Sequence, residues 1–259
     1  MALVAGRTVG FYTLLVATLI TIYYARRPMS TLPKIRPILA LQGMEEAIGR
    51  ATELGQPIHF TPGTASLVSE DAPQVFAALS ILEMVGRSAA RKGNGKIIVT
   101  VRFPEVMPLA QEALRSAYAA ESRTDLYSDD MVRFLSSAQF AYAAGTIAIM
   151  EREKVAANFM IGSFIGEALI LAEVGNKIGA IQVAGCARLG QIPFLVAACD
   201  YSMIGDELFA AAAIATNDPV QIANIRAQDV MKAIMILILI GGFVLRATGV
   251  ANISKILLK

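Results

Sequence analysis

Groups that could bind a ligand follow several short apolar runs of this 259-residue chain. Gly162-Ser163-x-x-Gly166 stands between an apolar run and a helical segment, where backbone N–H groups could face an anion. The pattern matches neither G-x-G-x-x-G nor G-x-x-x-x-G-K-[ST]. A tight strand-to-helix turn explains the same spacing, so an anion site and a plain turn both remain open.

Glu167 is a second candidate because it falls on an apolar helix face. Helical spacing places it on one face with Ile170, Leu171 and Val174. A carboxylate in such surroundings needs a partner or takes a raised pKa. Arg188 or the Ser163 hydroxyl could be that partner. The pattern fits a structural buried pair, a ligand site or a catalytic carboxylate, and the buried pair is the commonest of these.

Asp200 and His59 complete the groups that could do chemistry. Asp200 is predicted to end a buried strand, where it could meet a ligand, cap a turn or pair with Arg188. His59 is the only histidine and is flanked by apolar residues, which favours a hydrogen-bonded structural role. No metal site is predicted from one histidine without a cysteine cluster. The G-x-S-x-G motif of serine hydrolases is missing, so whether the chain is an enzyme stays undecided.

The elements that must position these groups are predicted to be strands of a mostly parallel sheet. Continuous apolar runs that stop at Gly, Pro or Asp are typical of strands buried on both faces. The predicted strands are Pro57–Thr61, Lys96–Phe103, Ala157–Ile161, Ala180–Ala184 and Phe194–Cys199. If all are parallel, their carboxyl ends meet at one edge, where α/β folds bind ligands. The ligand candidates expected there are Thr61, Gly63, Arg102, Gly162, Ser163, Glu167, Arg188 and Asp200. They identify no particular cofactor.

The composition indicates membrane segments beside a heavily buried domain. Of the residues, 55% are hydrophobic and 17% are charged, against about 45–50% and about 25% in soluble domains. The net charge of +2 and the absence of tryptophan make nucleic acid a poor candidate partner. Cys186 and Cys199 lie in or beside apolar runs and are expected to be buried free thiols rather than parts of a zinc site or a disulfide framework.

A first membrane segment is predicted at Thr8–Tyr24, which is uncharged, mostly apolar and just long enough to cross a bilayer. Tyr23 and Tyr24 fit an interfacial aromatic belt. The proline-rich basic stretch Arg26–Pro37 then forms a collar at the membrane surface. A cleaved signal peptide is the alternative, but its small-residue exit site is missing, so a retained anchor is favoured.

A second span is predicted within Val230–Val250, centred on Ala233–Leu245. The chain is therefore divided into an anchor and collar (residues 1–37), an α/β domain (38–224), and a second membrane helix with its tail (225–259). Phe134–Met150 also lacks charge, but serines, a glutamine and many alanines favour a buried core helix over a third span.

Two spans would put both termini on one side of the membrane and the α/β domain on the other. Six basic residues flank the spans on the domain side and four on the terminal side. The positive-inside rule then places the domain in the cytoplasm, with the chain in the cell inner membrane.

Several phrases resemble an uncharacterised family of prokaryotic membrane proteins known only as a domain of unknown function. They are GEALILAEVGNKIGAIQVAG, QIPFLVAACDYSMIGDELFAAAA, PIHFTPG and RFLSSAQFAYAAG. The resemblance covers most of the chain from Gly43 onward. It implies a prokaryotic source and a membrane location, and it brings no catalytic residues with it.

The favoured function is a membrane-anchored, non-enzymatic scaffold that forms a homo-oligomer or joins other membrane subunits. The membrane segments carry no charge at their centres, so no transport path is visible. The alternative is a membrane-tethered enzyme or sensor that binds a small molecule or nucleotide at the strand ends.

Overall fold

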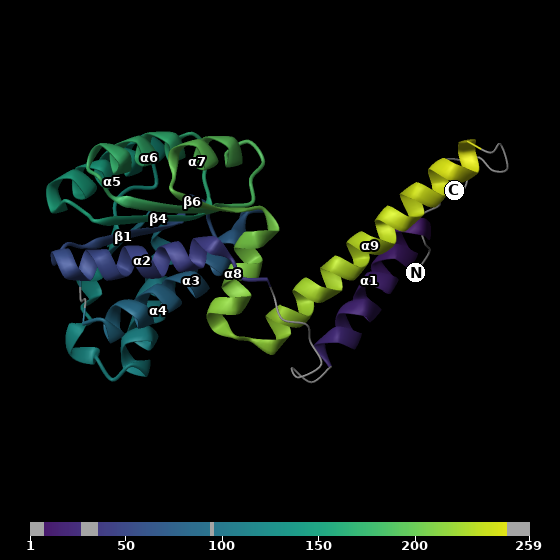
Figure 1. Ribbon diagram of the computed structural model, residues 1–259, viewed down its shortest axis with the longest axis horizontal. Helices are drawn as coiled ribbons and strands as arrows, with labels where there is room; N and C mark the ends of the chain where they lie inside the picture. Colours follow the sequence, from purple (N-terminus) through teal and green to yellow (C-terminus); the bar gives the residue numbers. More distant parts are fainter. Residues whose placement is uncertain (1–7, 27–35, 94–95, 248–259) are drawn as a thin grey trace. The chain divides into compact units, whose positions relative to one another are not determined.

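A computed structural model describes residues 8–26, 36–93 and 96–247. The chain divides into two compact units. One is the α/β unit, Arg36–Thr216, and the other contains the helices α1 and α9 (Figure 1). The amino-terminal seven residues, most of the predicted basic collar and the predicted tail lie outside the described residues.

The α/β unit is built on one six-stranded sheet whose strands are all parallel, in the order β3-β2-β1-β4-β5-β6. The strands are β1 (Ile58–Gly63), β2 (Ile97–Val101), β3 (Val132–Phe134), β4 (Ala157–Ser163), β5 (Ile181–Cys186) and β6 (Tyr201–Ile204). Every residue of β1, β2 and β4 is buried, as expected for strands covered on both faces. The prediction of an α/β domain with a parallel sheet is confirmed.

Helices cover both faces of this sheet (Figure 1). One layer contains α2 (Leu39–Leu54), α3 (Ala72–Arg91), α4 (Met107–Ala120) and α8 (Asp206–Thr216). The other contains α5 (Gln139–Glu153), α6 (Glu167–Lys177) and α7 (Ile192–Ala198). Side chains alternate along each strand, so Phe60 and Phe159 pack in the first core whereas Met160 and Ala184 pack in the second.

The prediction of a strand at Phe194–Cys199 is wrong. Ile192–Ala198 is the helix α7, with Pro193 in its first turn, where a proline is tolerated. A short apolar run fits a strand and a helix equally well, and the sequence offers no periodicity over seven residues to separate them. The strand at this point is β6, which begins at Tyr201 and therefore follows Asp200.

The uncharged segment Phe134–Met150 contains the end of β3 and most of α5. Tyr142, Ile149 and Met150 are buried on the inner side of α5. Its outer side carries Phe140 and exposed alanines. The three-residue strand β3 was not predicted, because it is shorter than the runs that a periodicity argument can detect.

The second unit holds α1 (Thr8–Ala25) beside α9 (Pro219–Ala247), which run antiparallel (Figure 1). Among the described residues one helix, Pro219–Val244, is long and apolar enough to cross a membrane. The apolar part of α1, Gly10–Ala25, falls short of that length. At a rise of about 1.5 Å per residue this segment is about 24 Å long, which is about one fifth short of the roughly 30 Å of hydrocarbon. Of the predicted pair of spans, one helix therefore has the length and composition of a span, and two spans are not confirmed.

Candidate functional site

The strand order reverses between β1 and β4, which lie side by side in the sheet. From β1 the chain continues to β2 and β3 on one side, and from β4 it continues to β5 and β6 on the other. The helix after β1, α3, covers one face, and the helix after β4, α6, covers the opposite face. In open α/β sheets ligands bind beyond the carboxyl ends of the strands at such a reversal. We call the ends of β1 and β4 the switch point.

The two loops of the switch point are in direct contact. Gly63 pairs with Ser163, and the Thr64 amide donates to the Ser163 carbonyl at 2.7 Å. Gly162 has a φ of +128°, and a Cβ added there would collide with the carbonyl oxygen of Pro62. Both glycines are required because the backbones approach more closely than any side chain would allow. The start of the Gly162-Ser163-x-x-Gly166 turn therefore packs against the backbone at the end of β1 and in the loop after it.

Glu167 is fully buried at the start of α6 and lies directly beside this contact. Its Oε1 accepts from the Thr64 hydroxyl and from the Ile165 amide at 3.2 Å, and its Oε2 accepts from the Gln139 amide at 2.5 Å. Burial acts to raise the pKa of this carboxyl, but the hydrogen bonds from Thr64, the backbone and Gln139 outweigh it and hold the pKa below its usual range. Glu167 is therefore a buried carboxylate held by neutral donors, without Arg188 as a partner.

Asp71 joins three segments at the same edge, although sequence reasoning did not single it out. Its Oδ2 accepts from the Ser163 hydroxyl at 2.8 Å and from the Arg188 guanidinium at 3.3 Å. Its Oδ1 accepts from the Gln74 side chain at 2.9 Å, and Gln74 in turn accepts from the Ala187 amide. An acid just before Ala-Pro at a helix start was the available signal, since such acids commonly stand at helix N-termini.

Arg102 fastens the end of β2 to the same cluster. Its guanidinium donates to the Thr64 carbonyl at 3.3 Å and to the Ser137 carbonyl at 3.0 Å. The structure thus brings together at one edge the candidates Gly63, Arg102, Gly162, Ser163, Glu167 and Arg188. Each side chain named among them is bonded to another part of the protein.

Asp200 does not belong to this edge. It precedes β6, and its Oδ2 accepts from the Gln182 amide near the start of β5 at 2.7 Å. It therefore lies at the opposite end of the sheet, because the run before it is a helix and not a strand. The two thiols are not activated either, since burial raises the pKa of Cys186 and raises that of Cys199 to about 12.

Thr61, the remaining candidate, belongs to a buried polar ladder that crosses the sheet beneath α5 and α6. His59, Asn158 and Gln182 stand opposite one another on β1, β4 and β5. The ladder continues through the Thr100 hydroxyl, 2.9 Å from His59 Nε2, to the hydroxyl of Tyr142. Thr61 lies 2.7 Å from that same Tyr142 hydroxyl, so its side chain faces the helix layer and not solvent.

The hydrogen-bond directions in this ladder fix the state of His59. Gln182 donates its amide to the Ala172 carbonyl, so its oxygen accepts from the Asn158 amide at 2.9 Å. The Asn158 oxygen must then accept from His59 Nδ1 at 2.8 Å, and Nε2 accepts from Thr100. Burial lowers the pKa of His59 to about 4, against the opposing effect of the Asn158 bond. The imidazole is therefore neutral, with its proton on Nδ1.

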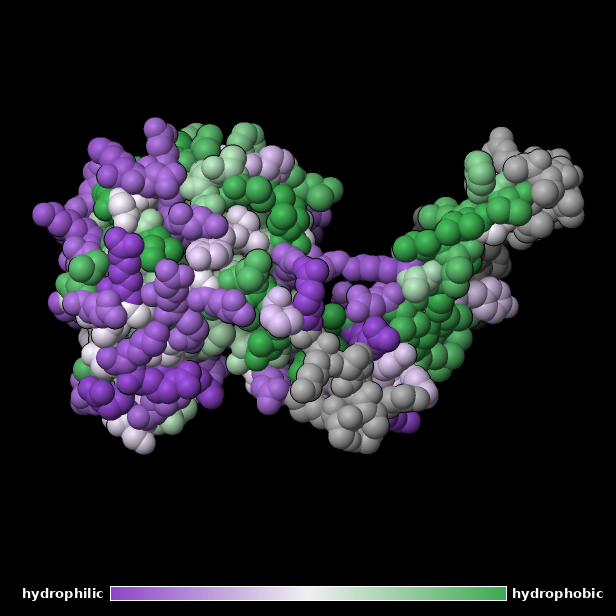
Figure 2. All heavy atoms as spheres, in the orientation of Figure 1, coloured by the Kyte–Doolittle hydropathy of each residue, from purple (hydrophilic) through white to green (hydrophobic). Residues whose placement is uncertain are grey.

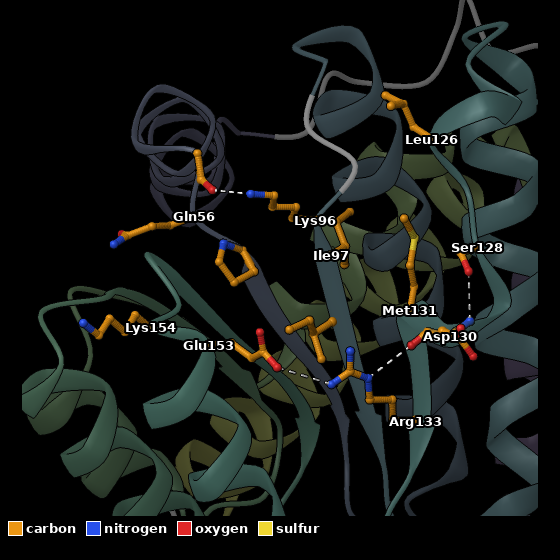
Figure 3. A pocket seen from close by; sticks show the side chains of 13 residues that line it. Gln56, Lys96, Ile97, Leu126, Ser128, Asp130, Met131, Arg133, Glu153 and Lys154 are labelled. Atoms are coloured by element: carbon orange, nitrogen blue, oxygen red, sulfur yellow. Dashed lines mark hydrogen bonds and ion pairs between the residues drawn. The ribbon is translucent and has the colours of Figure 1, made fainter.

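A surface cavity of about 520 Å³ lies at the amino ends of β1, β2 and β3, away from the switch point (Figure 3). Arg133 on its wall donates to the Asp130 carbonyl at 3.2 Å and lies 3.9 Å from Glu153. Lys96 donates to the carbonyl of Gly55 at the end of α2. Basic side chains near the carboxyl ends of helices commonly donate to backbone carbonyls that lack a partner within the helix. The position of Lys96 therefore has a structural explanation, and Arg133 likewise donates to a backbone carbonyl.

The chemistry open to the switch point is limited by these bonds. The Ser163 hydroxyl donates to a carboxylate, while the only histidine of the chain is bonded within the ladder, so no Ser-His-Asp relay forms. Within residues 8–26, 36–93 and 96–247, no cluster of His, Cys, Asp or Glu could hold a metal ion. The arrangement ties β1, β2, β4 and β5 together at one edge.

Comparison with curated proteins and with solved structures gives no match for this chain. A family model described as a domain of unknown function (DUF6754) matches residues 4–257. That match takes in the α/β unit and both flanking helices, and it agrees with the uncharacterised family that the sequence phrases resemble. The chain therefore belongs to the family of the domain of unknown function DUF6754.

Proposed function

We propose that this protein is a membrane-anchored structural subunit that assembles with copies of itself. The observation that carries this proposal is the apolar surface of α9, where every residue from Ile234 to Ile240 is exposed. Exposing seven consecutive apolar side chains to water is unfavourable, whereas the hydrocarbon of a lipid bilayer would surround them without that cost. The bilayer is thus the first partner in this proposal.

The second helix of the unit supports the same assignment. Leu14, Leu19 and Tyr23 on α1 are more than half exposed. As a pair, α1 and α9 would form a two-helix anchor with both ends of the chain on one side. The excess of basic residues on the domain side favours a cytoplasmic α/β unit at the inner membrane.

The structural rather than catalytic role is supported by the switch point. Its loops touch, and Glu167, Ser163 and Arg102 are all bonded within the protein. A ligand at this edge would have to displace several of those bonds. The same bonds fix the relative positions of four strands, which suits a rigid domain that presents a surface.

Alkaline extraction of membranes from cells that express the full chain tests the anchor. The protein is expected to stay in the pellet at high pH, because hydrophobic burial in lipid does not depend on charge. Release into the supernatant, at the level of a peripheral control protein, would show that α9 does not hold the chain in the bilayer.

A ligand-binding function is the second candidate, and the strand order favours it. The order 3-2-1-4-5-6 is that of doubly wound folds that bind dinucleotides at the strand reversal. Asp71, which bonds Ser163 and Arg188, keeps about a fifth of its side chain exposed there. A small-molecule adduct retained by the native protein and lost in Asp71→Asn would replace the structural proposal with this one.

A further inference from the structure

The layer formed by α5, α6 and α7 exposes several large apolar side chains on its surface. Its exposed large side chains are 41–76% accessible. They are Phe140, Ile165, Leu169, Ile170, Phe194 and Val196, which we call the α5–α7 apolar face. Five of them lie on the three helices, which cover the same side of the sheet, and Ile165 lies in the loop just before α6. Figure 2 shows apolar residues over the region where Figure 1 places α6 and α7.

The opposite layer has a different surface. Its helices expose many charged side chains, namely Glu46, Arg50, Glu53, Arg87, Arg91, Glu112 and Arg115. On α5 the charged residues are confined to the carboxyl-terminal end, and α7 has none. On α6 the carboxylate of Glu167 in the first turn is buried, so the exposed charges of that helix are Glu173 and Lys177 in its second half. Depletion of charge from the centre of a patch, with charge at its rim, is the pattern of a protein interface core.

We propose that the α5–α7 apolar face binds the same face of a second copy of this chain. The proposal rests on the proposed function and names the surface through which assembly occurs. An isologous contact needs a patch that is complementary to itself, and a largely apolar patch with equal numbers of acids and bases around it meets that condition. The six side chains would remove roughly 600 Å² per copy from water, near the roughly 800 Å² per partner of a standard interface.

The rim charges favour a second copy over a bilayer. Apart from the buried Glu167, the charged residues of this layer are three acids and three bases, with Lys177 paired to Glu151 at 3.0 Å. They are Glu151, Arg152 and Glu153 at the end of α5, Lys154 just after it, and Glu173 and Lys177 in the second half of α6. The net charge of this set is zero, so two copies would meet without a net electrostatic repulsion. A helix layer that lies on anionic lipid carries an excess of Lys and Arg at its rim, which this face lacks.

Substitutions with matched controls on the opposite layer test this surface. Leu169→Lys and Phe194→Lys are expected to lower the oligomeric fraction of the detergent-solubilised full chain at least tenfold, measured by native mass spectrometry. Leu109→Lys on α4 and Phe76→Lys on α3 have comparable exposures of 38% and 53% and are expected to change nothing. An oligomer that survives both face substitutions, or that is equally lost in the controls, overturns the proposal.

Cysteine cross-linking of the otherwise unchanged chain gives a second measurement that does not depend on a lysine at the interface. Ala144→Cys lies on the exposed side of α5, and Ala119→Cys is its control on the exposed side of α4. A short bis-maleimide is expected to give a covalent dimer in membranes at position 144 only. Equal yields at both positions, or no dimer at 144 in an oligomeric protein, would refute the face. A wild-type chain that is monomeric throughout would instead refute the proposed assembly as a whole.

Discussion

His59 is the residue whose chemical state follows most directly from its neighbours. Its two ring nitrogens bond Asn158 and Thr100, and burial lowers its pKa to about 4 from an ordinary 6.5. Above pH 6.5 the imidazole is neutral in both the folded and the unfolded protein, so the fold keeps its full stability. As the pH falls from 6.5 toward 4, the unfolded chain takes up a proton that the folded protein does not, and the free energy of unfolding decreases. At the lower pH the loss amounts to about 3 kcal/mol.

The single histidine makes this prediction directly measurable. In ¹⁵N-histidine-labelled protein, NMR is expected to show one neutral imidazole protonated on Nδ1, unchanged between pH 7.5 and pH 5. The free energy of unfolding of wild type should decline over that range, whereas the His59→Gln variant should be less stable at pH 7.5 but nearly independent of pH there. A ring that titrates near pH 6.5 in the folded protein would contradict the assignment.

Glu167 carries a second prediction at the same scale. Glu167→Gln replaces an acceptor oxygen by a donor that faces Gln139 or Thr64, so buried donors lose their partner at a cost of about 1–3 kcal/mol. Because the folded-state pKa of this carboxyl is lowered, its stabilisation is present above its unfolded pKa and is lost as the pH falls through the folded value.

Urea unfolding at pH 7 and pH 4 measures both effects of Glu167→Gln. The variant should lose stability at pH 7 and show a smaller decrease between the two pH values than wild type. Glu173→Gln, on the exposed side of the same helix, is the control and is expected to be neutral. Equal stabilities of Glu167→Gln and Glu173→Gln would mean that the bonds to Glu167 contribute nothing.

Residue-level roles could be predicted only where they depend on neighbours in the chain. The backbone freedom at Gly162 and the burial of Glu167 follow from local pattern. The partners of Glu167 do not, because Thr64 reaches it from the loop after β1 and Gln139 from the start of α5. His59 was expected to be structural, yet its ladder depends on strand register, which no single strand sequence encodes.

At the scale of elements, the contact between the β1 and β4 loops determines how closely the strands approach. Gly162→Ala is expected to destabilise the fold by at least about 3 kcal/mol, because it adds a collision with Pro62 to an unfavourable φ. Gly179→Ala has a positive φ but open space, so it should cost about 1–2 kcal/mol.

Thermal or urea unfolding of these glycine variants provides the measurement, with Gly190→Ala as a third comparison. Gly190 has neither a positive φ nor a neighbour within 4 Å of an added Cβ, so its variant should be close to wild type. The order of destabilisation should be Gly162, Gly179, Gly190. Equal effects at Gly162 and Gly179 would show that the loops are not in close contact.

The elements themselves were predicted with uneven success for physical reasons. The β1, β2, β4 and β5 regions are continuous apolar runs between turn residues, and that pattern has few alternatives. The apolar run at Ile192–Ala198 is equally compatible with a helix, and tertiary packing against α6 and β6 decides it. Because this run is a helix, Asp200 precedes β6 and lies at the amino ends of the strands, whereas it was predicted at their carboxyl ends.

At the scale of the whole molecule, α9 is the proposed membrane anchor. Leu239→Arg would place a charge in the middle of its apolar segment, at an insertion cost of about 3 kcal/mol. The variant is expected to shift protein from the alkali-resistant pellet to the soluble or degraded fraction. Val68→Arg, at an almost fully exposed position of the α/β unit, should leave the distribution unchanged. Identical distributions for the two variants would contradict insertion of α9.

The native mass of the full chain, extracted in mild detergent from its own membranes, tests the central claim most directly. A self-assembling structural subunit should give masses at multiples of 27.6 kDa without a bound small molecule. A single species at 27.6 kDa would contradict assembly, and a retained adduct of small-molecule size would contradict the structural role.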